Sequence, residues 1–245
     1  MRRTWDLTDL EFAAAWSAAG EEQLPQPLLY TSRTELLADS ERELRQAAVR
    51  VRATHGAALD PVLAVLGRPD IRVVVHGRSP GDPDSPNGQI RLHACRLRRT
   101  GYLVTQLPGE TRWHSGGYTI VELDALDLAK AVVDALPTVG PGRYRDIVLP
   151  EGGIDHGEAI RTRANRFLAL PAAMTGSVTV LQGHSAFGPR GISSRTVRWR
   201  DLADDGRYVI TGSPSAANGA DARRMAAAIN NAIAHIVAAI QEERR

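Results

Sequence analysis

The spacing of apolar residues changes from a helical period to a strand period twice along this chain, in the same order each time. Up to about residue 66 apolar residues recur every three or four positions, and from about residue 71 they recur every second position. Ile90, Leu92 and Ala94 alternate in this way with Arg91, His93 and Cys95. Because successive strand residues face opposite sides of a sheet, this alternation predicts an antiparallel sheet with one covered face.

Capping patterns and prolines place the elements of the first half. Thr8 and Glu11 are spaced as a capping box, in which a hydroxyl and a carboxylate satisfy free N–H groups, and Ser32 and Glu35 repeat that spacing. The Pro- and Gly-rich segment 79–88 is expected to be a mobile hairpin tip. The first half is thus predicted to contain helices over about 9–18, 33–54 and 61–66, strands over 71–76, 89–96, 102–107 and 118–123, and a helix from Asp124 to Pro137.

The second half repeats this order after a Gly/Pro stretch at residues 140–142. We expect a helix over about 157–169, strands over 178–183, 194–199 and 207–211, a small polar loop over 213–220, and a terminal helix over about 222–243. The pattern therefore predicts an α+β fold of two quasi-symmetric halves, residues 1–137 and 138–245. Each half is expected to be an antiparallel sheet flanked by helices, and the two are expected to form one compact unit.

Composition narrows the classes of protein to consider. With 245 residues, 43% of them hydrophobic and 24% charged, the chain can bury a core, which excludes a disordered or collagen-like protein. The net charge of +2 is too small for a general nucleic-acid binder. Cys95 is the only cysteine, which excludes an internal disulfide and suits a reducing cytoplasm. An apolar leader and a run of about 18 apolar residues are both missing, so neither a signal peptide nor a membrane span is expected.

No motif of catalysis or cofactor binding is complete. Segment 183–187 resembles the turn that carries a nucleophilic serine, but Phe187 stands where a glycine is needed. Segment 140–145 lacks the third glycine of a dinucleotide fingerprint, and the seven histidines lack metal-ligand spacing. Asp201, Asp204 and Asp205 lack the bidentate glutamate of a calcium loop. We therefore expect no catalytic residue, no metal and no cofactor.

Several short motifs resemble a known family when their order and spacing are taken together. They are residues 9–12 with Trp16, the Leu-Pro-Gln-Pro-Leu segment at 24–28, segment 63–69 before the first predicted strand, and residues 199–201 followed by 205–208. This series resembles the EspG family, the cytoplasmic chaperones of type VII (ESX) secretion in actinobacteria, over nearly the whole chain. The sequence departs from the family in its short first half and in segment 79–88, which bear on the identity of the partner.

The resemblance implies an EspG-like globular unit without catalytic activity. Such a protein binds the apolar tip of a helical PE/PPE-like heterodimer, keeps it soluble in the cytoplasm, and leaves it to the ESX secretion machinery. We expect a monomer or a weak homodimer, with no membrane contact. Phe12 and Trp16 lie one turn apart on a helix and are expected to be buried rather than to contact the partner.

The terminal helix has a wider apolar arc than one sheet face needs, so part of it is expected to face the partner. The alternative is that all of this arc packs inside the second half. By resemblance to the family, the sheet and the C-terminal helices would form the binding platform. The expected partner-binding residues are Tyr102, Val104, Trp113, Tyr118, Ile229, Asn231 and Ile233.

Two other functions compete with the chaperone hypothesis. One is a small-molecule enzyme with a cleft between the halves, using His76, His93 or Asp201 as the acid or base. The other is a structural subunit that uses the same surface without releasing its partner. A co-purifying helical heterodimer would favour the chaperone, and a bound metabolite would favour the enzyme.

Overall fold

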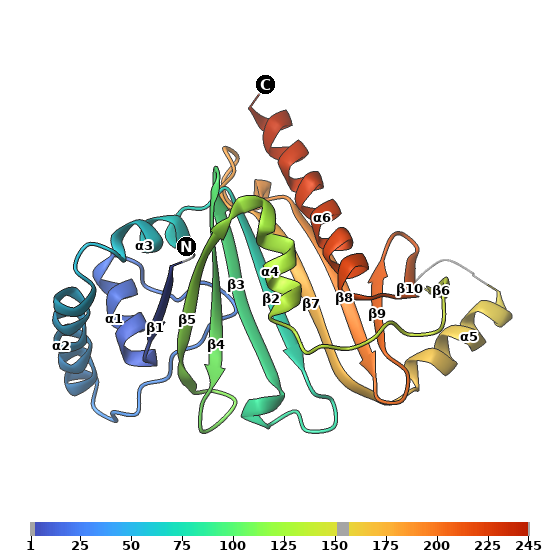
Figure 1. Cartoon of the computed structure of the whole chain (residues 1–245), viewed down its shortest axis with the longest axis horizontal. Helices are drawn as coiled ribbons and strands as arrows, with labels where there is room; N and C mark the ends of the chain where they lie inside the picture. Colours follow the sequence, from blue (N-terminus) through green and yellow to red (C-terminus); the bar gives the residue numbers. More distant parts are fainter. Residues whose placement is uncertain (1–2, 151–156, 245) are drawn as a thin grey trace.

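In the computed structural model, which describes residues 3–150 and 157–244, the chain forms one ten-stranded antiparallel sheet with helices on both faces (Figure 1). Residues 1 and 2 belong to the N-terminal segment for which no signal peptide is expected, and they lie outside the described residues. The strands are β1 (Thr4–Leu7), β2 (Ile71–Arg78), β3 (Gln89–Leu97), β4 (Thr100–Pro108), β5 (Ser115–Asp124), β6 (Ile147–Leu149), β7 (Ala172–Gln182), β8 (Ser194–Leu202), β9 (Arg207–Thr211) and β10 (Ser215–Gly219). The α-helices are α1 (Asp9–Ala18), α2 (Leu37–His55), α3 (Asp60–Gly67), α4 (Leu128–Asp134), α5 (Glu158–Leu168) and α6 (Ala222–Glu243).

The strand order is the same counted inward from either outer edge. One side reads β1-β5-β4-β3-β2 and the other reads β6-β10-β9-β8-β7, so the two series meet where β2 pairs with β7. That pairing joins all eight residues of β2 to residues 175–182 of β7. The sheet is therefore continuous through the middle of the molecule.

Trp199 packs across this central pairing. Gly77 of β2 and Gly176 of β7 are directly opposite each other, and Trp199 of β8 is opposite Gly176 on its other side. A Cβ atom added at Gly176 would lie only 2.2 Å from the Trp199 ring, and one added at Gly77 would lie 3.0 Å from it. The two glycines thus leave the space that the buried indole fills.

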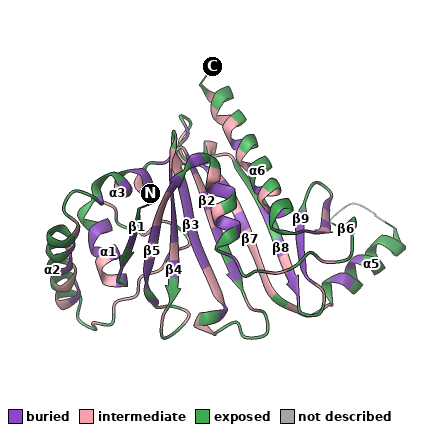
Figure 2. Ribbon diagram, viewed as in Figure 1, coloured by how far each residue is buried: buried purple, intermediate pink, exposed green. Residues whose placement is uncertain are grey.

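Helices α4 and α6 cover one face of the central strands, where they run in front of the sheet in Figure 1. On the opposite face, the helices of residues 3–150 and 157–244 cover the sheet only toward its two ends. Helices α1 and α3 pack there on β3, β4 and β5, and α5 packs on the β8, β9 and β10 end. Figure 2 shows the buried strand segments beneath α4 and α6 and the exposed outer helices α2 and α5.

The capping predictions have different outcomes at the two sites. The Thr8 and Glu11 box is present and begins α1, as predicted. The box at Ser32 and Glu35 is wrong, because α2 begins at Leu37 after an uncapped residue. Ser32 instead accepts a hydrogen bond from the backbone N–H of Thr34, and the neighbouring Arg33 pairs with Glu110 on the β4–β5 connection.

Three short strands were not predicted: β1, β6 and β10. The last lies in the segment expected to be a small polar loop, residues 213–220. Its Ser, Ala, Asn and Gly residues show no apolar alternation, but small residues permit a close approach of backbones. A Cβ atom at Gly219 would lie only 1.8 Å from the Gly142 carbonyl oxygen. Close backbone packing, rather than an alternation of apolar residues, therefore determines this strand.

The predicted burial of Phe12 and Trp16 is confirmed, with exposed fractions of 0% and 4%. The Trp16 indole N–H also donates to the Gln23 carbonyl at 2.7 Å. Replacing Trp16 with Ala is therefore expected to lower the free energy of unfolding by about 3–5 kcal/mol in a denaturant titration. The matched control is Trp113→Ala, whose side chain is 55% exposed and whose loss is expected to cost less than about 1 kcal/mol. Equal losses in the two variants would contradict this assignment.

Candidate functional site

The central strands have one buried face and one face that no helix in the described part of the chain covers. Along β2, Ile71, Val73 and Val75 are buried beneath α4 and α6. The intervening residues point the other way and are half-buried or exposed. The same division continues on β7 and β8, where Val178, Val180, Val197 and Trp199 form the buried set.

We call the uncovered surface the central face, and its members follow from the strand register. Across β2, β7 and β8 the directly opposed sets run in four rows. These rows are Arg78, Thr175 and Arg200; His76, Ser177 and Arg198; Val74, Thr179 and Thr196; and Arg72, Leu181 and Ser194. With strands about 4.8 Å apart and rows about 6.7 Å apart, the Cα positions cover a patch of about 10 Å by 20 Å.

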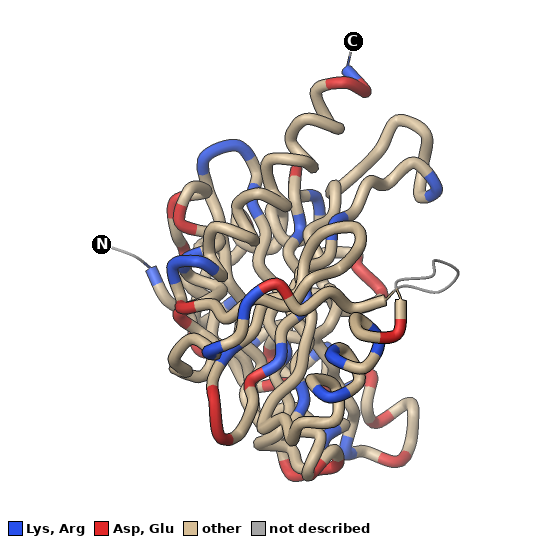
Figure 3. The backbone as a smooth tube through the Cα atoms, turned by 90° about the vertical axis from the view of Figure 1, so that its right-hand side faces the viewer, with Lys and Arg blue, Asp and Glu red and all other residues tan. Residues whose placement is uncertain are grey.

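The central face has an apolar middle between basic ends. Val74 and Leu181 are half-buried there, and the Thr179 and Thr196 hydroxyls lie 3.1 Å apart. Arginines stand at both ends of this strip: Arg72 at one, and Arg78, Arg198 and Arg200 at the other. The four rows contain no Asp or Glu. Elsewhere the acidic and basic residues are interspersed along the chain (Figure 3).

Three of the four arginines of the central face, Arg72, Arg198 and Arg200, donate hydrogen bonds to uncharged acceptors. Arg72 donates to the Gly183 carbonyl at 3.2 Å, and Arg198 donates to the Ser215 hydroxyl at 3.2 Å. Arg78 makes no ion pair or side-chain hydrogen bond within the described part of the chain. Burial, reinforced by the charges of Arg91 and Arg78, lowers the pKa of His76, so this imidazole is neutral at pH 7. The charge of the central face at pH 7 is therefore that of its arginines.

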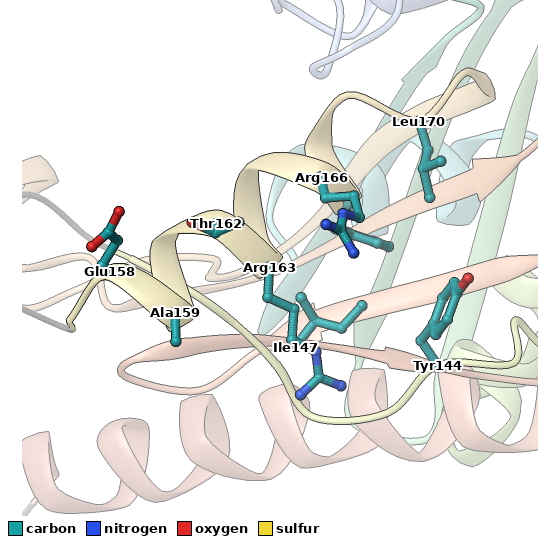
Figure 4. A pocket seen from close by; sticks show the side chains of 9 residues that line it. Tyr144, Ile147, Glu158, Ala159, Thr162, Arg163, Arg166 and Leu170 are labelled. Carbon is teal, nitrogen blue, oxygen red and sulfur yellow. The ribbon is translucent and has the colours of Figure 1, made fainter.

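A cavity of about 840 Å³ lies between α5 and the segment that leads into β6 (Figure 4). Ile147, Phe167 and Tyr144 give it a largely apolar lining. Arg163 and Arg166 extend from α5 toward that segment, and the Arg163 guanidinium donates to the backbone of residue 145 at 3.0 Å. Its volume is in the range of sites that bind a drug-sized molecule or a group of side chains.

Arg200 connects the central face with this cavity. Its guanidinium donates to the carbonyl oxygens of Leu168 at 3.2 Å and Leu170 at 2.8 Å, both at the C-terminal end of α5. It also lies 5.7 Å from the centre of the Phe167 ring, which lines the cavity. Burial lowers the pKa of Arg200, but a guanidinium remains charged at neutral pH.

The structure does not bring the seven predicted partner-binding residues together. Four of them are buried, with exposed fractions of 4% or less: Tyr102, Val104, Tyr118 and Ile229. The first three pack under α1 and α3, and Ile229 packs from α6 onto the opposite face of the sheet. These four side chains belong to two hydrophobic cores and are not accessible to a partner.

Three of the seven reach the surface. Trp113 is exposed on the β4–β5 connection, with the Arg112 guanidinium 4.4 Å from its ring centre. Asn231 is exposed on α6 and Ile233 is half-buried there. Binding through these three stays a prediction. The sequence reasoning missed the central face, although Arg72, His76 and Arg78 at every second or fourth position of β2 were a signal for a polar face.

The three residues considered for acid–base catalysis do not converge. His93 on β3 and Asp201 on β8 are separated in the sheet by β2 and β7. His93 is 1% exposed, with Nδ1 2.6 Å from the Gln26 carbonyl, and Asp201 is committed to a buried ion pair with Arg207 at 2.8 Å. His76 and His93 share a face on adjacent strands but lie in different rows. Among the described residues, no group of three or more His, Cys, Asp or Glu side chains is placed to hold a metal ion.

The burial of His93 predicts a loss of stability in acid. Burial lowers the pKa of His93 to about 4 from the usual 6.5. Between these two pH values the unfolded chain binds a proton at this imidazole and the folded protein does not. Stability is therefore complete above about pH 6.5 and decreases as the pH falls toward 4. The variant His93→Gln is expected to be less stable at pH 7 but to lose less between pH 7 and pH 5, as measured by urea unfolding. An equal loss in both proteins would rule out this role of His93.

Comparisons with known proteins agree with the fold. The family model described as the EspG family matches residues 8–231. A solved structure, the Mycobacterium tuberculosis type VII secretion system chaperone EspG5 in complex with a PE25-PPE41 dimer, is similar with a TM-score of 0.59 at 12% sequence identity. The alignment covers 95% of this chain and 96% of the EspG5 chain. No curated protein matches, and no helix in the described residues is long and apolar enough to span a membrane. Since the family model extends over most of its length, this chain belongs to the EspG family.

Proposed function

We propose that this chain is a cytosolic chaperone of type VII (ESX) secretion that binds a PE/PPE-like heterodimer. The observation that carries the proposal is the combination of family membership with a likeness to EspG5 that covers both chains almost completely. EspG5 is a secretion chaperone, and its structure was solved with a PE25-PPE41 dimer bound. Because this chain has the same family, the same fold and an uncovered sheet face, we infer that it binds the same kind of partner.

A chaperone of this kind needs no chemical step. A helical partner that exposes apolar side chains at its tip tends to self-associate, and a preformed surface removes that tip from water. Burial of roughly 1,200–2,000 Å² in total is typical of a specific complex. Affinity then comes from contact alone, and release is left to the secretion machinery that receives the partner.

Of the residues predicted to bind this partner, Trp113, Asn231 and Ile233 remain in the proposal. They do not form one surface with each other, because Trp113 lies on the β4–β5 connection and the other two lie on α6. Trp113 has the character of an interface anchor, an exposed aromatic ring beside a guanidinium. Asn231 and Ile233 belong to a second surface on α6. Partner binding by the variant Ile233→Arg tests this second surface separately.

The chaperone proposal predicts that metals and nucleotides do not stabilise the protein. A ligand that binds the folded state raises the melting temperature by mass action. Excess EDTA, zinc or ATP is therefore expected to leave the melting temperature unchanged in a thermal melt. A shift of several degrees with any of these additions would favour the enzyme hypothesis instead.

The direct test is co-expression with PE/PPE-like pairs encoded in the same genome. With the tag on this chain alone, we expect one pair to co-purify and to elute as a single complex by size-exclusion chromatography with light scattering. The free chaperone is expected to be a monomer or a weak homodimer. If each pair is expressed in soluble form and none associates at low salt, the proposed function is wrong.

A further inference from the structure

We propose that the cavity beside α5 binds a small amphiphilic anion, a carboxylate that carries a single apolar chain. Such a ligand would be bound in addition to a protein partner, and its binding does not depend on the chaperone function. The basis is the juxtaposition of an apolar floor with two guanidiniums that no carboxylate of the described residues pairs with.

The floor of the cavity is aromatic and aliphatic. Ile147 and Phe167 are each 3% exposed and belong to the hydrophobic cluster at this end of the sheet, and Tyr144 lines the cavity beside them. The centre of the Tyr208 ring lies 5.0 Å from that of Phe167 and 6.4 Å from that of Tyr144. An apolar chain that lies on this floor is removed from water.

The wall opposite α5 is the segment that leads into β6, and it is held in place by hydrogen bonds of the protein itself. The backbone N–H of Tyr144 donates to the Tyr208 hydroxyl at 3.1 Å. The backbone N–H of Asp146 donates to the side-chain oxygen of Asn218 at 2.9 Å. Because this wall is already fixed, a ligand that enters the cavity pays little for ordering it.

Two arginines one turn apart on α5, Arg163 and Arg166, line the same cavity (Figure 4). Arg163 donates to the carbonyl oxygen of residue 145 at 3.0 Å, and the Arg166 side chain makes no ion pair or hydrogen bond with another described residue. A cation on α4, by contrast, is paired on its own helix, Lys130 with Asp134. Like charges one turn apart destabilise a helix, and an anion bound by both guanidiniums relieves that repulsion.

The lining is basic toward one end only. Glu158 also lines the cavity, but it stands at the start of α5, eight residues before Arg166, or about 12 Å along the helix axis. A volume of about 840 Å³ is in the range of sites that take one drug-sized molecule. The matching ligand therefore has one anionic head and one apolar chain, rather than charges along its whole length.

A nucleotide is the other kind of small anion to consider. Tyr144 offers an aromatic surface to a base, but the ribose hydroxyls and the phosphates need several hydrogen-bond partners. Ile147, Phe167 and Leu170 would face these polar groups without a hydrogen bond, which is costly once water is removed. These features favour a chain-bearing carboxylate over a nucleotide.

The test is calorimetric titration of the purified chain with decanoate, kept below the concentration at which it forms micelles. Decanol, which has the same chain and no charge, is the matched ligand. Arg166→Gln removes one charge of the cavity, and Ala159→Trp fills the cavity from α5. The control variant is Arg50→Gln, the same change at an exposed position on α2, at the other end of the sheet. Circular dichroism and a thermal melt establish that each variant is folded.

We expect the wild type to bind one decanoate per chain and to bind decanol about tenfold more weakly. Arg166→Gln is expected to weaken decanoate binding about tenfold and to leave decanol binding within about twofold, because only the anion loses a charged partner. Ala159→Trp is expected to weaken the binding of both ligands, since it occupies their space. Arg50→Gln is expected to bind decanoate within about twofold of the wild type.

Four results would overturn the inference. The first is no saturable binding of decanoate to the folded wild type, and the second is equal affinity for decanol and decanoate. The third is unchanged decanoate binding in both folded cavity variants, which would place the binding elsewhere. The fourth is displacement of decanoate by ATP together with weaker ATP binding in Arg166→Gln, which would make the cavity a nucleotide site. The partner heterodimer is absent from these titrations, so their failure leaves the proposed function to its own co-expression test.

Discussion

The pairing of β2 with β7, sealed on one side by Trp199, is the contact on which the rest of this structure depends. It joins two five-stranded series into one sheet through eight opposed residue pairs. Gly77 and Gly176 make room for the indole on the covered side, where a Cβ atom at Gly176 would collide with it. The same register places Arg78, Thr175 and Arg200 in one row on the uncovered side. Without this pairing there would be neither a common core nor a central face.

The arrangement of the helices follows from the division between the two faces. Alternate residues of the central strands are aliphatic on one side and polar or basic on the other, so α4 and α6 pack on the aliphatic side. The other helices cover only the strands whose second face is also apolar, as with Tyr118 and Ile120 under α1 or Tyr208 and Ile210 near α5. Among the described elements, what remains uncovered is the face of β2, β7 and β8 on which only a narrow apolar strip, Val74 and Leu181, lies between arginines. This physical reason for an open surface is also what makes it available to another protein.

Much of this fold could be predicted from local patterns, and the limits of those patterns are visible at particular residues. The capping box at Thr8, the alternation around Ile90, and the apolar stripe of the terminal helix each identified an element correctly. Strand β10 was missed because its residues are small to allow close packing against Gly142. The residues near β10 in the sequence do not indicate this long-range contact. Tyr102 and Tyr118 were expected at a binding surface because apolar alternation does not say which face an unseen helix covers. The arginines of the central face become a site only through the register of strands that are about a hundred residues apart in sequence.

The most direct test of the account is the reactivity of a single thiol on the central face, with and without the partner. Cys95 is fully buried and burial raises its pKa to about 12, so the native thiol does not compete for a maleimide reagent at pH 7. Thr196→Cys introduces one exposed thiol in the middle of the central face, and Val49→Cys introduces one on the exposed side of α2. We expect the heterodimer to protect the thiol at position 196 and to leave the thiol at position 49 reactive. Equal labelling at position 196 in the free chain and in the complex would contradict it.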